Sequence, residues 1–162
     1  MCGGLEGARS MVSVAFRHGL SGASRCRAPR PWGTTTAVGA LSGRCILIVE
    51  DLPDTAEVLT EALTLAGADV RSASTAVEGL HILAKWTPDA LLLDIELPDL
   101  DGYELLDTIR YSTAMRDIPA VAISAHPPDS SRRPRLGTGF ATFRSKPIHL
   151  PELVQLLADL IV

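Results

Sequence analysis

Residues 91–102 read Leu-Leu-Leu-Asp-Ile-Glu-Leu-Pro-Asp-Leu-Asp-Gly, an apolar run that stops at an acid and is followed by a turn. The three leucines indicate a strand buried in a core. Asp94 follows them directly, and Pro98 and Gly102 then lead the chain away. Open α/β sheets bind their ligands beyond the carboxyl ends of the strands. The stretch therefore predicts a carboxylate at such an edge.

The sequence from residue 45 onward alternates short apolar runs with helical periods. Helices are expected from Pro53 to Gly67, between Thr75 and Pro88, after Asp101 and from residue 151 onward. Strands are expected at 45–49, 69–73, 90–93, 120–123 and 141–143. This alternation predicts an α/β fold, a doubly wound five-stranded parallel sheet with helices on both faces. Four apolar residues are expected to face largely inward along the first helix: Val58, Leu59, Leu63 and Leu65.

Residues 1–44 differ from the rest in composition, because Gly, Ser, Ala, Arg and Thr dominate and no helix or strand period persists. We expect a disordered N-terminal extension there and one folded domain at 45–162. Two alternatives stay open for 1–44. The Arg-rich, acid-poor composition also fits an organelle targeting segment, and a start codon assigned too far upstream would give a spurious extension.

Composition narrows the classes of partner. Of the 19 acidic residues, eighteen lie in 45–162, against nine of the 15 basic residues. An acidic domain does not favour direct binding to DNA, and few aromatic residues argue against a stacking platform for single strands. No apolar run reaches the length of about 18 residues that a membrane span needs. We expect neither nucleic acid nor membrane as a partner.

Acidic residues follow two of the expected strands: Glu50 and Asp51 after 45–49, and Asp94 after the leucines. Carboxylates beside a core are costly without a partner, and Mg²⁺ prefers oxygen ligands in near-octahedral geometry. A divalent cation site is one interpretation. Asp94 can also act as a nucleophile towards phosphorus. The alternative is that Asp51 and Asp94 cap helices and that Glu50 is solvated.

A hydroxyl and an ammonium follow two further strands. Ser124 comes directly after 120–123, and Lys146-Pro147 comes after the fifth strand, where the peptide bond can be cis. Taken singly, these are compatible with a turn serine and a surface lysine. The carboxyl ends of parallel strands meet at one edge, so acids, hydroxyl and ammonium are expected together. Such a set suits phosphoryl transfer, where catalysis is mostly positioning and charge neutralisation.

Four motifs in this order resemble the receiver domain of two-component response regulators over residues 45–162. They are Ile-Val-Glu-Asp-x-Pro-Asp at 48–54, Leu-Leu-Asp-x-x-Leu-Pro-x-x-Asp-Gly at 92–102, Ile-Ser-Ala at 123–125 and Lys-Pro at 146–147. The resemblance implies a flavodoxin-like (βα)5 receiver fold and a cytoplasmic phosphorelay module without an output domain. Such a module is no enzyme in the usual sense. It takes a phosphoryl group from a histidine kinase or phosphotransfer protein and signals to an unknown effector protein by conformational change.

The resemblance also implies roles by position. Asp94 would be the phosphoacceptor. Glu50, Asp51 and Asp94 would hold Mg²⁺, with Glu50 acting through water, and Glu96 would offer its backbone carbonyl to the metal.

Ser124 and Lys146 would contact the phosphoryl group, and Phe143 would be the switch aromatic that reorients on activation. Glu96 and His126 each stand two residues beyond a site residue, where this family exposes the acyl phosphate to water. Our hypothesis is that one of them sets the dephosphorylation rate. The alternative for His126 is a solvated loop histidine.

The chain departs from the family pattern at 126–139, where Pro134 would fall inside the usual fourth helix. A proline inside a helix costs about 3 kcal/mol, so we expect a short or irregular helix there. This departure leaves open a phosphorylation-independent pseudo-receiver that only binds partners. A Mg²⁺-dependent phosphohydrolase is disfavoured, because such enzymes often use Asp-x-Asp and this chain has Asp94-x-Glu96 without a cap insertion.

Overall fold

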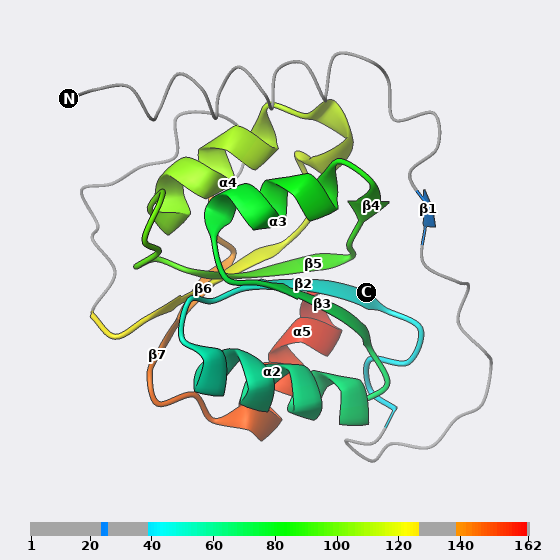
Figure 1. Ribbon diagram of the computed structural model, residues 1–162. Coiled ribbons are helices and arrows are strands. Elements are labelled where there is room, and N and C mark those ends of the chain that lie inside the picture. Colours follow the sequence, from blue (N-terminus) through cyan, green and yellow to red (C-terminus); the bar gives the residue numbers. More distant parts are fainter. Residues whose placement is uncertain (1–23, 26–38, 127–138, 162) are drawn as a thin grey trace.

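The computed structural model describes residues 24–25, 39–126 and 139–161 (Figure 1). Its centre is a parallel sheet of five strands in the order β3-β2-β5-β6-β7. The strands are β2 (Cys45–Val49), β3 (Asp69–Ala73), β5 (Ala90–Asp94), β6 (Ala120–Ser124) and β7 (Thr142–Ser145). The predicted α/β fold is therefore confirmed, with β7 placed slightly later than the expected 141–143.

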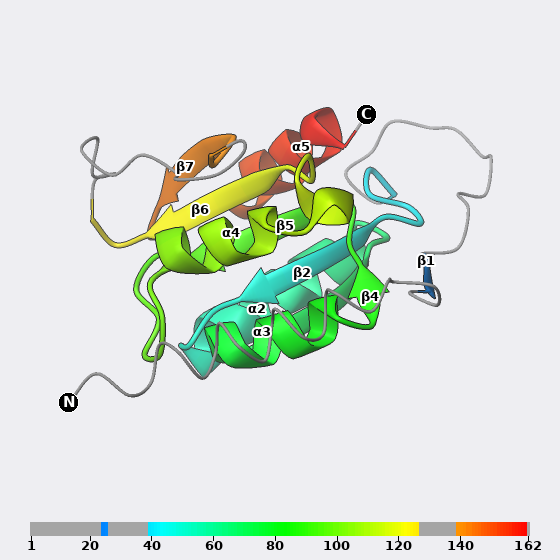
Figure 2. The same ribbon diagram turned by 90° about the horizontal axis from the view of Figure 1, so that it is seen from above.

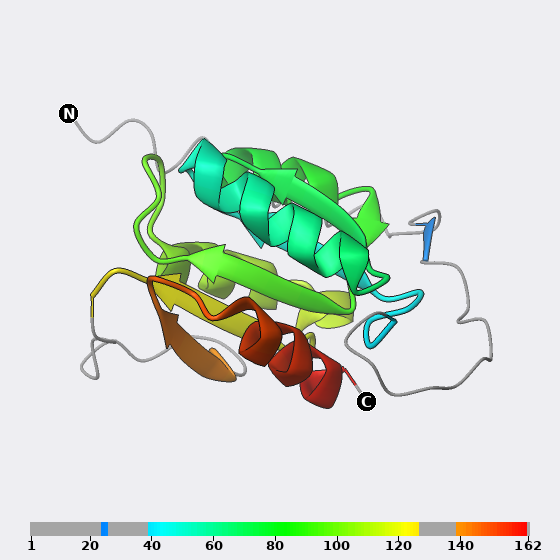
Figure 3. The same cartoon turned by 90° about the horizontal axis from the view of Figure 1, so that it is seen from below.

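Helices cover both faces of the sheet. Helices α3 (Ala76–Leu83) and α4 (Gly102–Arg110) lie on one face (Figure 2), and α2 (Pro53–Leu65) and α5 (Leu150–Leu160) lie on the other (Figure 3). A short 3₁₀ helix, η1 (Thr113–Met115), follows α4. Two-residue strands β1 (Ser24–Arg25) and β4 (Trp86–Thr87) pair in parallel outside the main sheet.

The sheet separates two hydrophobic cores, because successive side chains of a strand point to opposite faces. In β2, Ile46 and Ile48 join the core under α2 and α5, whereas Leu47 and Val49 join the core under α3 and α4. Every residue of β2, β5 and β6 is buried. This explains why these strands read as continuous apolar runs.

The expectation for the first helix was partly wrong. Leu59 and Leu63 are buried as predicted, but Val58 is 49% exposed and Leu65 is 69% exposed. Leu59 and Leu63 are four residues apart and share the face that meets the sheet. Val58 and Leu65 are seven residues apart, two helical turns, and share a different face that solvent reaches.

Side chains fix the starts of α3 and α4 as the sequence predicts. Thr75 Oγ1 accepts a hydrogen bond of 3.2 Å from the backbone N–H of Glu78, and the Glu78 carboxylate accepts one of 2.8 Å from Ser74. Thr75 and Glu78 together satisfy backbone donors at the start of α3. Asp101 caps α4 by accepting a hydrogen bond of 2.9 Å from Glu104.

Residues 39–44 belong to the packed part of the molecule. Leu41 is completely buried, and its N–H donates to the Ala66 carbonyl at the end of α2. The remaining residues of the expected 1–44 extension lie outside the described residues, apart from β1. The same holds for 127–138 with Pro134, so both expectations stay predictions. Among the described residues, no helix has the length and hydropathy needed to span a membrane.

Candidate functional site

Three acidic side chains meet at the carboxyl edge of the sheet. Glu50 and Asp51 directly follow β2, Asp94 ends β5, and these two strands are neighbours. One carboxylate oxygen from each of the three acids lies within 4.8 Å of the other two. Glu50 and Asp94 are only 1% and 2% exposed. The structure thus brings together the three carboxylates that the sequence suggested as metal ligands.

Lys146 reaches this cluster from the end of β7. Its Nζ donates hydrogen bonds of 2.6 Å to Asp94 Oδ2 and 2.9 Å to Glu50 Oε1. Burial alone would lower the pKa of Lys146, but the hydrogen bonds and charges of Asp94 and Glu50 outweigh it and raise the pKa. The side chain of Lys146 is therefore a charged ammonium. The peptide bond between Lys146 and Pro147 is cis, as the sequence allowed.

Glu50 has an unsatisfied oxygen beside the other acids. Its Oε1 accepts hydrogen bonds from Lys146 and from the N–H of Leu52, whereas Oε2 is buried without a hydrogen-bond partner. Burial raises the pKa of Glu50, the hydrogen bond from Lys146 opposes this, and the charge of Asp94 adds to it. One ammonium faces three carboxylates, so a hard cation would supply the missing positive charge. The donor set fits Mg²⁺.

Asp51 does not cap the following helix. The N-cap residue of α2 is Leu52, whose side chain makes no capping hydrogen bond. Asp51 is half-buried, and its carboxylate lies with those of Glu50 and Asp94. The alternative in which Asp51 is a helix cap is therefore wrong.

The orientation of Asp94 is fixed from two sides. Oδ1 accepts a hydrogen bond of 2.8 Å from the N–H of Glu96, and Oδ2 accepts the one from Lys146. The loop that follows is closed by a hydrogen bond of 3.0 Å from the Gly102 N–H to the Ile95 carbonyl. Asp94 is thus held in one rotamer, with Glu96 directly beside it.

Ser124 ends β6, the strand between β5 and β7. It is 6% exposed, and its Oγ accepts a hydrogen bond of 3.0 Å from the N–H of His126. The Ser124 carbonyl accepts one of 2.9 Å from the N–H of Lys146. The side chains of His126 and Glu96 pair through Nδ1 and Oε1, although both are largely exposed. Sequence reasoning named both residues but did not predict their contact.

Phe143 lies apart from the acids in an aromatic cluster. Its ring centroid is 5.4 Å from that of Phe140 and 6.4 Å from that of Tyr103, which belongs to α4. Tyr103 and Phe140 meet edge to face at 5.6 Å. The cluster connects α4 with β7. The sequence did not predict that Tyr103 and Phe140 belong to this cluster, because isolated aromatic residues suggest only ordinary packing.

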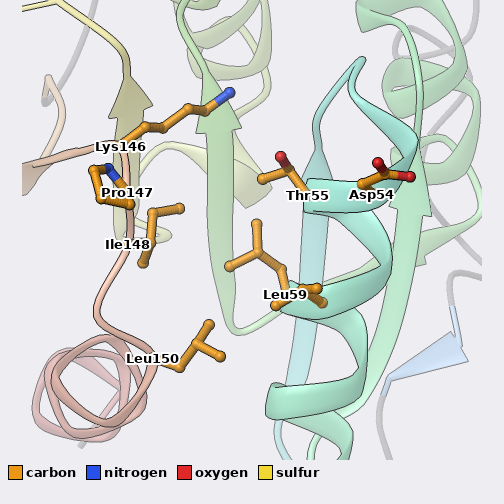
Figure 4. Close-up of a pocket in the computed structure, with 8 residues that line it drawn as sticks. Asp54, Thr55, Leu59, Lys146, Pro147, Ile148 and Leu150 are labelled. Carbon is orange, nitrogen blue, oxygen red and sulfur yellow. The ribbon is translucent and has the colours of Figure 1, made fainter.

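A cavity of about 350 Å³ lies beside Lys146, between the start of α2 and the residues leading into α5 (Figure 4). Its walls are mostly apolar and combine residues far apart in the chain. The lining residues are Asp54, Thr55, Val58, Leu59, Lys146, Pro147, Ile148 and Leu150. The sequence did not reveal this cavity, because it depends on how α2 lies against the segment before α5.

The parallel sheet and the edge of acids, hydroxyl and ammonium are features that this chain shares with one family of known proteins. The family model of the response regulator receiver domain matches residues 46–158. The chain belongs to this family, which comprises signalling domains of two-component systems.

Several known proteins contain a segment that is similar to this chain. The chain is 37% identical to the response regulator MprA of Mycobacterium avium over 109 residues, 67% of this chain and 47% of MprA. It is 35% identical over 112 residues to a 14.6 kDa protein of Leptolyngbya boryana, 69% of this chain and 86% of that one. It is 32% identical to the sensor histidine kinase RcsC of Salmonella typhi over 113 residues, which are 70% of this chain but only 12% of RcsC.

Solved structures show the same fold. A putative response regulator of Chloroflexus aurantiacus superposes with a TM-score of 0.66 at 31% identity, covering 73% of this chain and 97% of that one. The receiver domain of a sensor histidine kinase from Pseudomonas aeruginosa superposes with a TM-score of 0.66 at 30% identity. The match covers 74% of this chain and 98% of that one. That structure has a magnesium ion coordinated in its active-site cleft.

Proposed function

We propose that this chain is a cytoplasmic phosphoacceptor module of a two-component phosphorelay. Asp94 takes a phosphoryl group from the phosphohistidine of a sensor kinase or phosphotransfer protein, in a Mg²⁺-dependent reaction. The observation that carries this proposal is the placement of Asp94 in a cluster of three carboxylates, 2.6 Å from the ammonium of Lys146. An isolated buried carboxylate would lack both the metal ligands and the counter-charge for an incoming phosphoryl group.

The transfer forms a bond between an Asp94 carboxylate oxygen and phosphorus while the phosphorus–nitrogen bond of the donor breaks. The electron pair of that bond returns to the imidazole, which takes up a proton. Glu50, Asp51, Asp94 and the Glu96 carbonyl would hold Mg²⁺, and the ion would supply positive charge for the phosphoryl oxygens. The two hydrogen bonds to Asp94 keep its carboxylate in one orientation for the attack.

Phosphorylation changes the partners of two neighbouring residues. Lys146 loses its hydrogen bond to the Asp94 carboxylate and gains a phosphoryl oxygen of the same charge sign. Among the described residues, Ser124 Oγ only accepts a hydrogen bond, from the N–H of His126, so its hydroxyl can donate to the phosphoryl group. These contacts bias an existing two-state equilibrium. Phe143, three residues before Lys146 in the chain, is proposed to transmit the change to an effector protein.

The proposal is tested by incubating the protein with acetyl phosphate, with MgCl₂ or with EDTA, and measuring the intact mass. A gain of one phosphoryl group that requires Mg²⁺ supports the phosphoacceptor. A complete lack of gain would indicate a phosphorylation-independent interaction module. Repeated turnover of varied phosphate esters would instead indicate a phosphohydrolase.

The paired side chains of Glu96 and His126 are proposed to limit the access of water to the phosphoryl group. Glu96→Ala and His126→Ala are each expected to shorten the lifetime of phosphorylated protein by about threefold, a change of less than 1 kcal/mol in the barrier. The lifetime is measured from the loss of phosphoryl mass after removal of acetyl phosphate. The control is His149→Ala, because His149 also pairs with an exposed glutamate, Glu152, at the start of α5. Unchanged lifetimes in both test variants would refute the hypothesis.

The cavity beside Lys146, which forms a groove between α2 and the segment before α5, is proposed to receive a helix of the phosphodonor protein. Lys146 contacts Asp94 and also lines the groove, so a helix seated there lies next to the acceptor. Val58 lines the same groove and is 49% exposed. Leu52, directly after Asp51, is 50% exposed. An apolar surface continuous with the acceptor site suits a protein donor and is irrelevant to a small one.

Val58→Arg is therefore expected to separate the two kinds of donor. Transfer from a phosphorylated histidine kinase should slow about tenfold, which corresponds to about 1.4 kcal/mol, because a charge replaces an apolar contact. Phosphorylation by acetyl phosphate should stay at the wild-type rate. The matched control is Val77→Arg, since Val77 is 39% exposed but belongs to α3 on the opposite face of the sheet. Equal transfer rates in Val58→Arg and Val77→Arg would place the donor elsewhere.

A further inference from the structure

Asp99 connects two parts of the molecule that are separate in the chain. It lies in the loop 95–101 between β5 and α4. Its Oδ1 accepts a hydrogen bond of 3.0 Å from the N–H of Ala76, and its Oδ2 accepts one of 2.9 Å from Val77. These donors start α3, where backbone N–H groups have no acceptor within their own helix. Asp99 therefore fastens the loop after β5 to the first turn of α3.

Helix α3 is in turn fixed to the end of β2. The Glu50 N–H donates a hydrogen bond of 3.0 Å to the Ala73 carbonyl, shortly before the helix begins. A methyl group on Gly79 would lie 2.9 Å from Val49 Cγ2, so the helix is in very close contact with the strand end. Through α3, Asp99 thus links the loop after β5 to the strand end that carries Glu50 and Asp51.

The charge of Asp99 suits this link. Burial alone would raise the pKa of Asp99, but the hydrogen bonds from Val77 and Ala76 outweigh it and lower the pKa. A carboxylate at a helix N-terminus is also favoured by the helix dipole. Asp99 is therefore ionised at neutral pH and uses both oxygens as acceptors.

The proposed metal ligands come from the two parts that Asp99 connects. Glu50 and Asp51 follow β2, whereas Asp94 and the Glu96 carbonyl belong to β5 and its loop. Mg²⁺ demands near-octahedral geometry with short bonds, whereas Ca²⁺ accepts varied geometries. We infer that Asp99 is a positioning residue of the Mg²⁺ site, which keeps the loop bearing Glu96 in register with the acids after β2. This inference rests on the proposed function.

The inference is tested by titrating the protein with MgCl₂ and with CaCl₂ while following amide signals by two-dimensional NMR. In Asp99→Ala, the Mg²⁺ dissociation constant is expected to rise about tenfold, the lower end of the range for residues that support metal ligands. The Ca²⁺ dissociation constant should change by less than about threefold, because Ca²⁺ tolerates a displaced ligand. Asp99→Asn keeps one acceptor oxygen and should give an intermediate Mg²⁺ affinity. If Asp99→Ala does not fold, the Mg²⁺ affinity of Asp99→Asn tests the inference in its place.

Thr75→Ala is the matched control. It removes a different cap from the same helix, the hydrogen bond from Glu78, without releasing the loop after β5. It should lower the melting temperature and leave Mg²⁺ affinity at the wild-type value.

Equal Mg²⁺ affinity in Asp99→Ala and wild type would overturn the inference, as would an equal loss in Thr75→Ala. An equal loss for both metals would also overturn it, since it would indicate general loosening. A wild-type protein that binds no Mg²⁺ would defeat the proposed function together with the inference. If the wild type binds Mg²⁺ and Asp99→Ala binds it equally well, only the inference fails and the proposed function stands.

Discussion

Asp94→Asn is expected to abolish the gain of phosphoryl mass from acetyl phosphate and Mg²⁺. The amide oxygen of asparagine is a poor nucleophile towards phosphorus, whereas a carboxylate can form an aspartyl phosphate. The substitution nearly conserves shape, and the Asn oxygen can still accept the hydrogen bond from the Glu96 N–H. The loss of reaction should therefore not come from a loss of fold.

The stability of Asp94→Asn against denaturant is a second measurement on the same variant. The charge of Asp94 contributes to the raised pKa of Glu50, so its removal relieves repulsion between two buried carboxylates. Lys146 keeps its hydrogen bond to Glu50. We expect Asp94→Asn to unfold at the same denaturant concentration as the wild type or at a higher one, while it remains unphosphorylated.

Asp101→Asn is the control for this experiment. Asp101 lies in the same loop and caps α4, and asparagine is about as good an N-cap as aspartate. This variant should gain one phosphoryl group as the wild type does. A full phosphoryl gain in Asp94→Asn would show that another side chain is the acceptor, and Asp51 would be the next residue to replace.

The sequence predicted that these side chains lie together, because most of them stand where an apolar strand ends. Glu50, Asp94 and Ser124 stand where a buried run stops, and Lys146 precedes a proline. Parallel strands bring such positions to one edge, so chain order alone was enough to group them. The Nζ of Lys146 then reaches Asp94 and Glu50 across β6, because the lysine side chain is long.

Features that depend on the path of loops were not predictable in this way. The pairing of Glu96 with His126 and the hydrogen bonds of Asp99 to α3 join residues from different connections. Neither has a periodic pattern or a local partner. The exposure of Val58 was misjudged for a related reason, because residue type was used where the orientation of the helix on the sheet decides burial.

Gly102→Ala is expected to damage both stability and phosphorylation. A methyl group on Gly102 would lie 2.5 Å from the Asp94 carbonyl oxygen and 2.9 Å from Ile95 Cα. Both atoms belong to the backbone, so a side-chain rotation cannot relieve the contact. Gly102 does not have a positive φ, and the cost is therefore steric. Overpacking of this kind typically costs about 1–3 kcal/mol, which chemical denaturation would measure.

The same contact transmits the damage to the acceptor. The backbone of Asp94 and Ile95 must move away from α4, and the hydrogen bonds that orient the Asp94 carboxylate shift with it. A displacement of about 1 Å in a reacting group can reduce a rate about 100-fold. We expect phosphorylation of Gly102→Ala by acetyl phosphate to slow at least about tenfold, even at temperatures where the variant is folded.

Gly79→Ala separates this effect from a general change of glycine to alanine in a helix. Its methyl group would meet Val49 Cγ2, the end of a side chain, and alanine gains up to about 1 kcal/mol of helix propensity over glycine. Gly79→Ala should thus lose less stability and keep more of the wild-type phosphorylation rate. If the two variants were equally stable and equally active, close packing under Asp94 would not hold the acceptor in place. Its orientation would then depend on the hydrogen bonds from Glu96 and Lys146 alone.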